Sequence, residues 1–204
     1  MLHKSETAMA MTIQADISNQ QDVENLFIRT KQQFGRIDVL INNAGTLEKQ
    51  MSFEQMNIER IKEVFNTNVF GQFICSKEAI KYMAKSKGGQ GGVIINVSSL
   101  AAITGAPNEY IDYAASKGAI DSFTIGLSKE IANEGIRVNA VRPAFIHTDI
   151  HSAGGEPGRI GRIKNSIPLK RGGKPEEVAE AILWLASDKA SYCTGTFIDI
   201  NGGK

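Results

Sequence analysis

Residues 92–99 read GVIINVSS, a short apolar run that follows a glycine-rich loop (GGQGG, 88–92) and ends in two serines. Continuous Val and Ile over so few residues predict a strand that is buried on both faces. Similar runs predict further strands at 10–15, 38–41, 137–141 and 196–200. Helical patterns separate them at 19–34, 57–84, 113–133 and from Pro175 onward. The alternation predicts an α/β fold with a parallel sheet covered by helices on both faces.

Two helix boundaries are marked by local chemistry. Ser18, with Gln21 three residues later, has the pattern of a capping box that opens the helix over 19–34, and Gly35 ends that helix. Pro175 suits the first position of the last helix. Polar residues that follow the strands are the candidates for a site, because ligands of such sheets bind at the carboxyl ends of the strands.

Composition limits the function classes. The 204 residues, predicted to form a single domain over 1–204, carry 23 Lys and Arg against 22 Asp and Glu. A net charge of +1 argues against a nucleic-acid or membrane-surface partner. Two distant cysteines give no disulfide framework and no cysteine-based zinc site, and they fit a reducing cytoplasm. The apolar runs are too short for a membrane span, so we expect a cytoplasmic protein.

Tyr113 and Lys117 lie four residues apart at the start of a predicted helix and share one of its faces. Tyr is a poor acid or base at neutral pH, but a nearby cation favours its phenolate and lowers its pKa. A tyrosine tuned in this way can move a proton to or from a substrate oxygen. The alternative reading of an isolated pair is an exposed Tyr and a solvated Lys.

Other polar residues stand at matching places along the chain. NNAG (42–45) and NVSS (96–99) end two predicted strands, NTNVFG (66–71) places Asn68 in the long helix, and RVNAVRPA (137–144) ends another strand. Each has an ordinary interpretation as turn or surface polarity. Together with YAASK (113–117), in this order and spacing, they resemble the short-chain dehydrogenase/reductase family over nearly the whole chain. Segments 110–123 and 151–163 are similar to its bacterial glucose-dehydrogenase-like members.

The resemblance implies a Rossmann-like doubly wound sheet and an oxidoreductase that passes a hydride between NAD or NADP and an alcohol or carbonyl substrate. It implies that Tyr113 is the general acid or base, that Lys117 lowers the pKa of Tyr113 and holds the nicotinamide ribose, that Ser99 binds the substrate oxygen, and that Asn68 helps to hold a water in a proton relay. The implied cofactor contacts are Asp16 and Ile17 near the adenine, Asn43, Ala44 and Gly45 along the nucleotide, and Pro143, Ile146 and Thr148 around the nicotinamide, beside Tyr113 and Lys117.

The sequence departs from the family in its opening unit. No glycine-rich phosphate turn of the GxGxxG, GxxxGxG or GxxxxGK type occurs in the chain. We therefore expect a sheet that is incomplete at the N-terminus, with the first strand–helix–strand unit absent, about 30 residues, and a Met1 that is not the natural start. The alternative function is a truncated, non-catalytic fragment that cannot bind a dinucleotide and acts only through protein association.

Smaller features carry further expectations. Ala144 stands where the family usually has Gly, which predicts modest crowding near the nicotinamide. His147 and His151 lack a nearby acidic partner at ligand spacing, so no metal site is expected. Segment 147–174 is predicted to be a mobile substrate loop. The family usually forms homotetramers through its two long helices, and a homo-oligomer, tetramer or dimer, is expected. A flavodoxin-like regulatory domain shares the alternating pattern but does not account for the spacing of Ser99, Tyr113 and Lys117.

Overall fold

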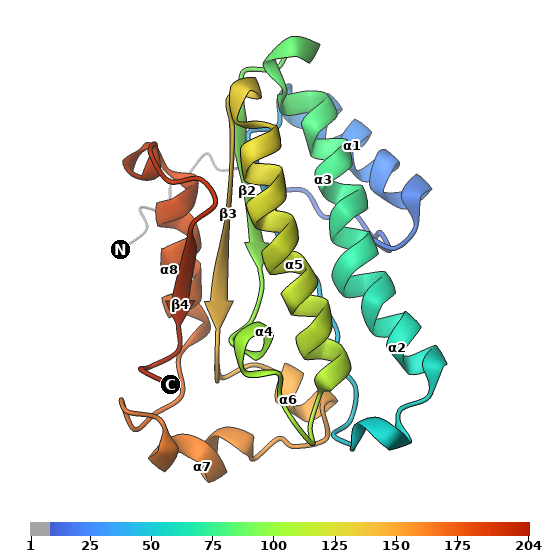
Figure 1. Ribbon diagram of the computed structural model, residues 1–204. Coiled ribbons are helices and arrows are strands. Elements are labelled where there is room, and N and C mark those ends of the chain that lie inside the picture. The colour runs from blue at the N-terminus through green and yellow to red at the C-terminus, as the bar shows by residue number, and fades with distance from the viewer. Residues whose placement is uncertain (1–8) are drawn as a thin grey trace.

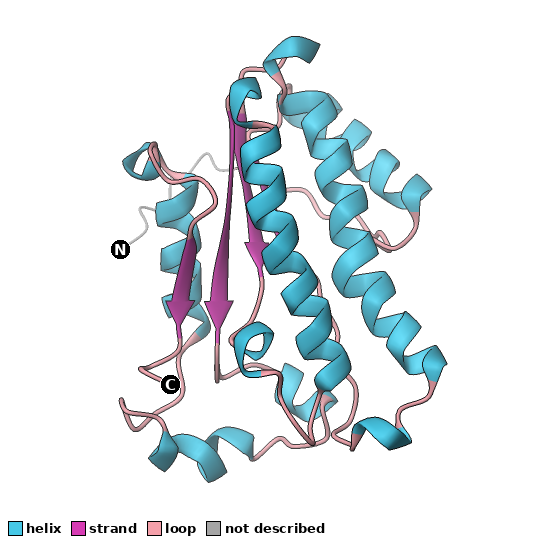
Figure 2. Cartoon of the chain, viewed as in Figure 1, coloured by secondary structure: helices cyan, strands magenta, loops and turns pink. Residues whose placement is uncertain are grey.

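The computed structural model describes residues 9–204 as a four-stranded sheet with helices on both faces (Figures 1 and 2). The strands are β1 (Val39–Asn42), β2 (Gly92–Val97), β3 (Ile136–Pro143) and β4 (Phe197–Ile200). The α-helices are α1 (Gln20–Phe34), α2 (Ile58–Phe65), α3 (Gln72–Met83), α4 (Ala101–Thr104), α5 (Ile111–Glu130), α6 (Ile150–Ala153), α7 (Arg159–Ile163) and α8 (Pro175–Ala186). A π-helical segment, η2 (Asn66–Gly71), joins α2 to α3, and short 3-10 turns are η1 (Phe53–Gln55), η3 (Lys85–Lys87), η4 (Ala132–Glu134), η5 (Lys164–Ser166) and η6 (Asp188–Ala190).

The strands pair in parallel in the order β1-β2-β3-β4. Alternate residues of β2 face opposite sides, so each side has its own core. Ile94 packs with side chains of α1 and α3, while Ile95 packs with side chains of α8. Figure 1 shows α3 and α5 to the right of the sheet and α8 to its left. The predicted Rossmann-like parallel sheet is therefore confirmed.

Residues 10–15 are the exception, because they form no strand. A strand needs a neighbour to accept its backbone hydrogen bonds, and in the described residues this segment pairs with none. β1 is an edge strand, and its Val39 and Ile41 side chains are 40% and 44% exposed. The apolar pattern of 10–15 suits a strand, but the pairing that would make it one does not occur here.

The helix boundaries differ slightly from the predictions. Asn19, not Ser18, caps α1, and its side chain accepts hydrogen bonds from the backbone N–H groups of Gln21 and Asp22. The predicted helix over 57–84 is present as α2, η2 and α3, and the predicted helix over 113–133 runs from Ile111 to Glu130. No helix within the described residues is long and apolar enough to cross a membrane.

Candidate active site

The carboxyl ends of the strands open onto a cavity of about 560 Å³. Because β1, β2 and β3 are parallel, the residues that follow them meet at one edge of the sheet. Asn43 follows β1, Ser99 follows β2 and Pro143 ends β3, and all three line the cavity. The polar residues after β1 and β2 therefore gather at one place, whereas Asp16, which follows the predicted strand over 10–15, does not line this cavity.

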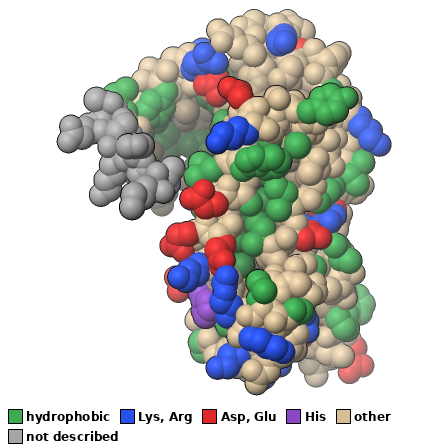
Figure 3. All heavy atoms as spheres, turned by 90° about the vertical axis from the view of Figure 1, so that its left-hand side faces the viewer, with side chains coloured by type: hydrophobic (Ala, Val, Ile, Leu, Met, Phe, Trp, Pro, Cys, Tyr) green, Lys and Arg blue, Asp and Glu red, His purple; other side chains and the backbone are tan. Residues whose placement is uncertain are grey.

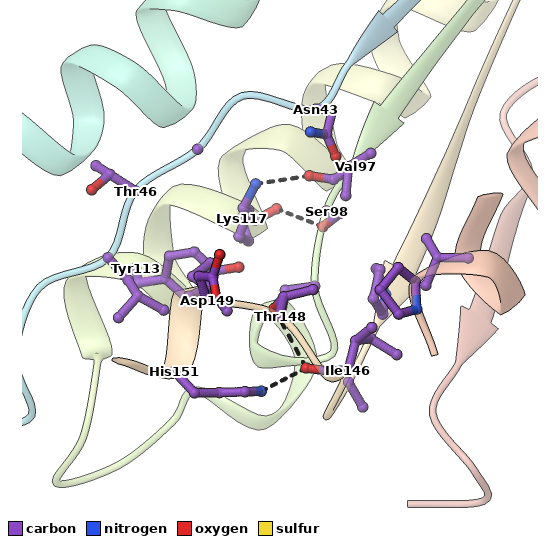
Figure 4. A pocket seen from close by; sticks show the side chains of 18 of the residues that line it. Asn43, Thr46, Val97, Ser98, Tyr113, Lys117, Ile146, Thr148, Asp149 and His151 are labelled. Atoms are coloured by element: carbon purple, nitrogen blue, oxygen red, sulfur yellow. Dashed lines mark hydrogen bonds between the residues drawn. The ribbon is translucent and has the colours of Figure 1, made fainter. Parts of the chain in front are cut away.

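Tyr113 and Lys117 enter the same cavity from the first turns of α5 (Figure 4). The Lys117 Nζ atom lies 5.6 Å from the centroid of the Tyr113 ring. It donates a 2.7 Å hydrogen bond to the backbone carbonyl of Val97, at the end of β2. α5 packs along β3, and this contact places Tyr113 and Lys117, which are one helical turn apart, beside the ends of the strands.

Burial dominates the electrostatics of the pair. It raises the pKa of the Tyr113 phenol above its ordinary value, and the hydrogen bond with the Ser99 hydroxyl opposes this by lowering it. Burial lowers the pKa of Lys117 to about 8, and the negative charge of Asp121 opposes that shift. The net shift of the Tyr113 pKa is upward, because burial is its largest cause. The lowering of this pKa by Lys117, which the family resemblance implies, stays a prediction.

Ser98 and Ser99 have different tasks. The Ser98 hydroxyl donates a 2.6 Å hydrogen bond to Asp121, whose other oxygen accepts one of 2.9 Å from Arg142. The Ser99 hydroxyl instead accepts a 3.1 Å hydrogen bond from the Ala101 N–H and lines the cavity. Ser98 therefore braces the strand end, and Ser99 remains the serine that can reach a ligand.

Asn68 lies in the π-helical segment η2 and is fully buried. Its Oδ1 accepts a 2.8 Å hydrogen bond from the Thr46 N–H, and its Nδ2 donates to the Thr46 carbonyl and to the Ser116 hydroxyl at 2.8 and 3.0 Å. These bonds fasten the loop after β1 to α5. Both amide N–H groups are used in this way, so the Asn68 side chain acts here as a brace.

Gly45 passes close to these two side chains. A Cβ atom at this position would lie 3.3 Å from Asn68 Oδ1 and 3.4 Å from Lys117 Nζ. The absence of a side chain keeps the cavity open between the loop after β1 and α5. Gly45 thus lies next to both Asn68 and Lys117 at the edge of the cavity.

The segment after β3 forms another wall of the cavity. Pro143, Ile146 and Thr148 line it, and Ile146 pairs with Gly173 in an isolated bridge. The His151 ring nitrogen Nε2 lies 2.8 Å from the Ile146 carbonyl (Figure 4). His151 therefore braces this wall. Residues 9–204 contain no group of three or more His, Cys, Asp or Glu that could hold a metal ion.

Three of the predicted cofactor residues do not line the cavity. Asp16 is exposed, and its carboxylate accepts hydrogen bonds from Ser18 that lower its pKa. Ile17 lies against Gly71, and the Ala44 carbonyl accepts a 3.4 Å hydrogen bond from Gln72. The cavity thus contains the predicted nicotinamide-side residues, whereas Asp16 and Ile17, predicted near the adenine, and Ala44, predicted along the nucleotide, do not line it.

A second cavity, of about 370 Å³, adjoins the first at Ser99, Tyr113 and Ala144. Its lining includes Tyr110 and the largely buried Arg159, and no motif in the sequence marks either residue as part of a site. Charged residues in the loop predicted over 147–174 were the available signal for Arg159. Part of this loop is helical, as α6 and α7.

Comparison with known proteins decides the family. Residues 2–204 match the protein family described as enoyl-(acyl carrier protein) reductase. An uncharacterised oxidoreductase of Escherichia coli K12, YgfF, is 56% identical over 195 residues, which are 96% of this chain and 79% of that protein. The chain belongs to the short-chain dehydrogenase/reductase family.

Two further relatives extend the comparison. A 3-oxoacyl-[acyl-carrier-protein] reductase of Synechocystis is 40% identical over 95% of this chain and 75% of that protein. The crystal structure of a 3-ketoacyl-(acyl-carrier-protein) reductase from Brucella melitensis, complexed with NADH, has a TM-score of 0.88 and 34% identity, covering 95% of this chain and 78% of that one. The chain therefore shares the fold of this reductase over nearly all of its length.

Proposed function

We propose that this short-chain dehydrogenase/reductase transfers a hydride between NAD or NADP and a small alcohol or carbonyl compound. The observation that carries the proposal is the meeting of Ser99, Tyr113 and Lys117 in one cavity at the carboxyl ends of the strands. Asn68 is the fourth residue of the proposed site, and it acts as a positioning residue through the hydrogen bonds that connect Thr46 with α5.

The tyrosine suits the role of an acid in carbonyl reduction. Because its pKa is raised, the phenol keeps its proton at neutral pH and can give it to a substrate oxygen as negative charge develops there. The Ser99 hydroxyl lines the same cavity as the phenol, so its O–H can turn toward the substrate oxygen and donate to it. With a pKa of about 8, Lys117 is mostly protonated at neutral pH and favours the phenolate left after the transfer.

The residues present fit the nicotinamide and ribose half of a dinucleotide. Gly45 leaves room beside Lys117, Thr148 offers a hydroxyl group, and Pro143 and Ile146 form an apolar wall. The nicotinamide would supply or accept the hydride, which is the chemistry of the cofactor itself. The NADH complex of the Brucella relative supports this assignment, since that structure resembles the chain over 95% of its length.

The second cavity is the proposed substrate site, because it shares Ser99 and Tyr113 with the first. It is lined by side chains of both polar and apolar kinds, so it can hold a carbonyl compound with a polar end. One relative is named as a 3-oxoacyl-[acyl-carrier-protein] reductase, and another, from Daucus carota, as a glucose and ribitol dehydrogenase. These names define the range of substrates to assay. The alternative of a non-catalytic fragment is not favoured by these similarities.

The test is a fluorescence titration of the purified chain with NADH and NADPH, followed by turnover assays on a panel of ketones, aldehydes and sugars. We expect saturable binding of one nucleotide and turnover of at least one carbonyl compound. Failure to bind either nucleotide would instead support the fragment alternative.

A matched variant tests the role of the tyrosine. Tyr113→Phe keeps the ring and its packing against Lys117 but loses the transferable proton. We expect turnover to fall by about 100-fold or more, with nucleotide affinity and the unfolding midpoint close to those of the parent. A Tyr113→Phe protein that turns over at the parent rate contradicts the assignment.

A further inference from the structure

A buried ion pair lies directly beside the proposed catalytic tyrosine. Arg60, on α2, and Asp112, in the first turn of α5, are 9% and 3% exposed. The Arg60 Nε donates a 2.7 Å hydrogen bond to Asp112 Oδ2, and an Nη2 hydrogen bond of 3.3 Å reaches Oδ1. The two planar groups therefore meet through two hydrogen bonds, a geometry that fixes orientation as well as distance.

The same guanidinium reaches a third segment. Its Nη1 donates a 2.6 Å hydrogen bond to the backbone carbonyl of Lys49, in the loop after β1. Arg60 thus connects α2, the first turn of α5 and this loop. Each of these segments carries or adjoins a residue of the site. Asn68 lies in η2, which follows α2; Tyr113 follows Asp112 in α5; and Gly45 lies in the loop after β1.

Asp112 also holds the backbone of the tyrosine. Its Oδ1 accepts a 2.9 Å hydrogen bond from the Tyr113 N–H. This N–H is one of the groups that a helix start leaves without a partner inside the helix. The N-cap residue of α5, Tyr110, makes no side-chain capping hydrogen bond. Asp112 therefore takes over that task, and Arg60 holds Asp112 in place for it.

The main effect of the Arg60–Asp112 pair is to fix the orientation of the start of α5 rather than to add stability. Removing two charges from water costs about as much as their attraction returns, so a buried ion pair contributes little more to stability than apolar packing would. Its hydrogen bonds are directional, however, and here they set the start of the helix that carries both Tyr113 and Lys117. A misplacement of about 1 Å at a reacting group can lower a rate by about 100-fold.

We propose that Arg60 and Asp112 are positioning residues, which set the Tyr113 phenol for proton transfer without touching the substrate. This proposal rests on the function proposed above for Tyr113. It assigns a role to two residues that the cavity linings do not include.

The first test compares kcat with nucleotide affinity in Arg60→Gln. We expect kcat to fall by about 10- to 100-fold, while the Kd for the nucleotide changes less than about threefold, because Arg60 lines neither cavity. The double variant Arg60→Gln/Asp112→Asn removes both charges and keeps an acceptor for the Tyr113 N–H. We expect it to recover a large part of kcat.

A core variant controls for lost stability. Val23, on α1, is fully buried in the core that α1 forms with α3 and β2, and it lines neither cavity. Val23→Ala is expected to lower the unfolding midpoint and leave kcat near that of the parent. If Val23→Ala loses as much kcat as Arg60→Gln at an equal drop in midpoint, the pair is merely structural and the proposal fails.

A spectroscopic measurement separates this proposal from the proposed function. In protein with isotope-labelled tyrosine rings, the Tyr113 signal can be assigned by its loss in Tyr113→Phe. Arg60→Gln should shift this signal, the double variant should move it back, and Val23→Ala should leave it in place. An unshifted signal together with an unchanged kcat overturns the positioning role.

The proposal stays testable if the parent shows no turnover or if Arg60→Gln does not fold. If the parent turns over no carbonyl compound, the proposed function fails, while the ring signal still decides whether Arg60 sets the orientation of Tyr113. If Arg60→Gln does not fold, Arg60→Lys takes its place, because it keeps the charge and loses the two-pronged geometry. The expected result is then a smaller fall in kcat, and a parent-like kcat and ring signal would refute the proposal.

Discussion

At the level of single residues, Lys117 links the site to the stability of the fold. Burial lowers its pKa to about 8, with Asp121 opposing the shift, whereas in the unfolded chain a lysine has a pKa of about 10.4. Between these two values the unfolded chain binds more protons than the folded protein does. The free energy of unfolding therefore rises with pH across this window, by at most about 1.4 kcal/mol per pH unit.

The prediction is that Lys117→Met reduces this rise. A methionine can fill much of the space of the lysine stem and cannot titrate, so the contribution of residue 117 disappears. Urea unfolding of parent and variant at several values between about pH 7 and pH 10 measures the difference. Equal slopes in the two proteins would show that Lys117 does not titrate with a lowered pKa.

At the level of elements, an ionic cluster fastens the α6–α7 segment over the second cavity. Glu156, between α6 and α7, accepts hydrogen bonds from Gln50, Arg159 and Arg162. Arg159 also pairs with Glu109, in the turn that precedes α5. The cluster thus joins the segment predicted to be a mobile loop to two segments that carry site residues.

Glu156→Gln is expected to loosen this segment. The arginine and glutamine hydrogen bonds, first that of Arg162, lower the pKa of Glu156 to about 2, so the charged form is stabilised and its contribution is lost as pH falls toward that value. Hydrogen exchange should become faster over 150–163 and stay unchanged in α8. Glu176→Gln, at an exposed glutamate in the first turn of α8, is the control. Unchanged hydrogen exchange over 150–163 in Glu156→Gln would show that the ionic cluster does not hold this segment in place.

At the level of the whole molecule, exposed apolar side chains gather on two faces. Phe70 and Ile125, from η2 and α5, are 53% and 42% exposed, and Phe73 packs on Phe123 at 4.3 Å between ring centroids. Leu183 and Trp184 are exposed on α8. Figure 3, which views the molecule from the side where α8 lies in Figure 1, shows apolar side chains in a central column with charged ones at its borders. Such patches are typical of interfaces, and they are consistent with the homo-oligomer that the family resemblance implies, which stays a prediction.

The oligomer prediction concerns the face made by α3 and α5. Ile125→Glu places a charge where two copies would pack, so we expect a dimer or tetramer to become smaller in light scattering. Ile28→Glu, at a similarly exposed position on α1, serves as the control and should keep the parent mass. A monomeric parent would refute the proposed assembly, and a parent-like mass for Ile125→Glu would exclude this face from it.

Local sequence is enough for much of this protein. Residue periodicity predicts the helices and four of the strands, because burial on one or both faces repeats along the chain. The spacing of Tyr113 and Lys117 places them on one helix face, and parallel strands bring Asn43 and Ser99 to one edge. These relations depend on neighbours within a few residues or on strand direction alone.

Packing in three dimensions settles the rest. Whether 10–15 is a strand depends on a pairing partner, and the direction of the Tyr113 pKa shift depends on how much water the neighbouring elements exclude. The contact of Arg60 with Asp112 spans 52 residues and exists because α2 packs on α5. Hydrogen bonds and desolvation act over a few ångströms of space, so segments distant in the chain determine them.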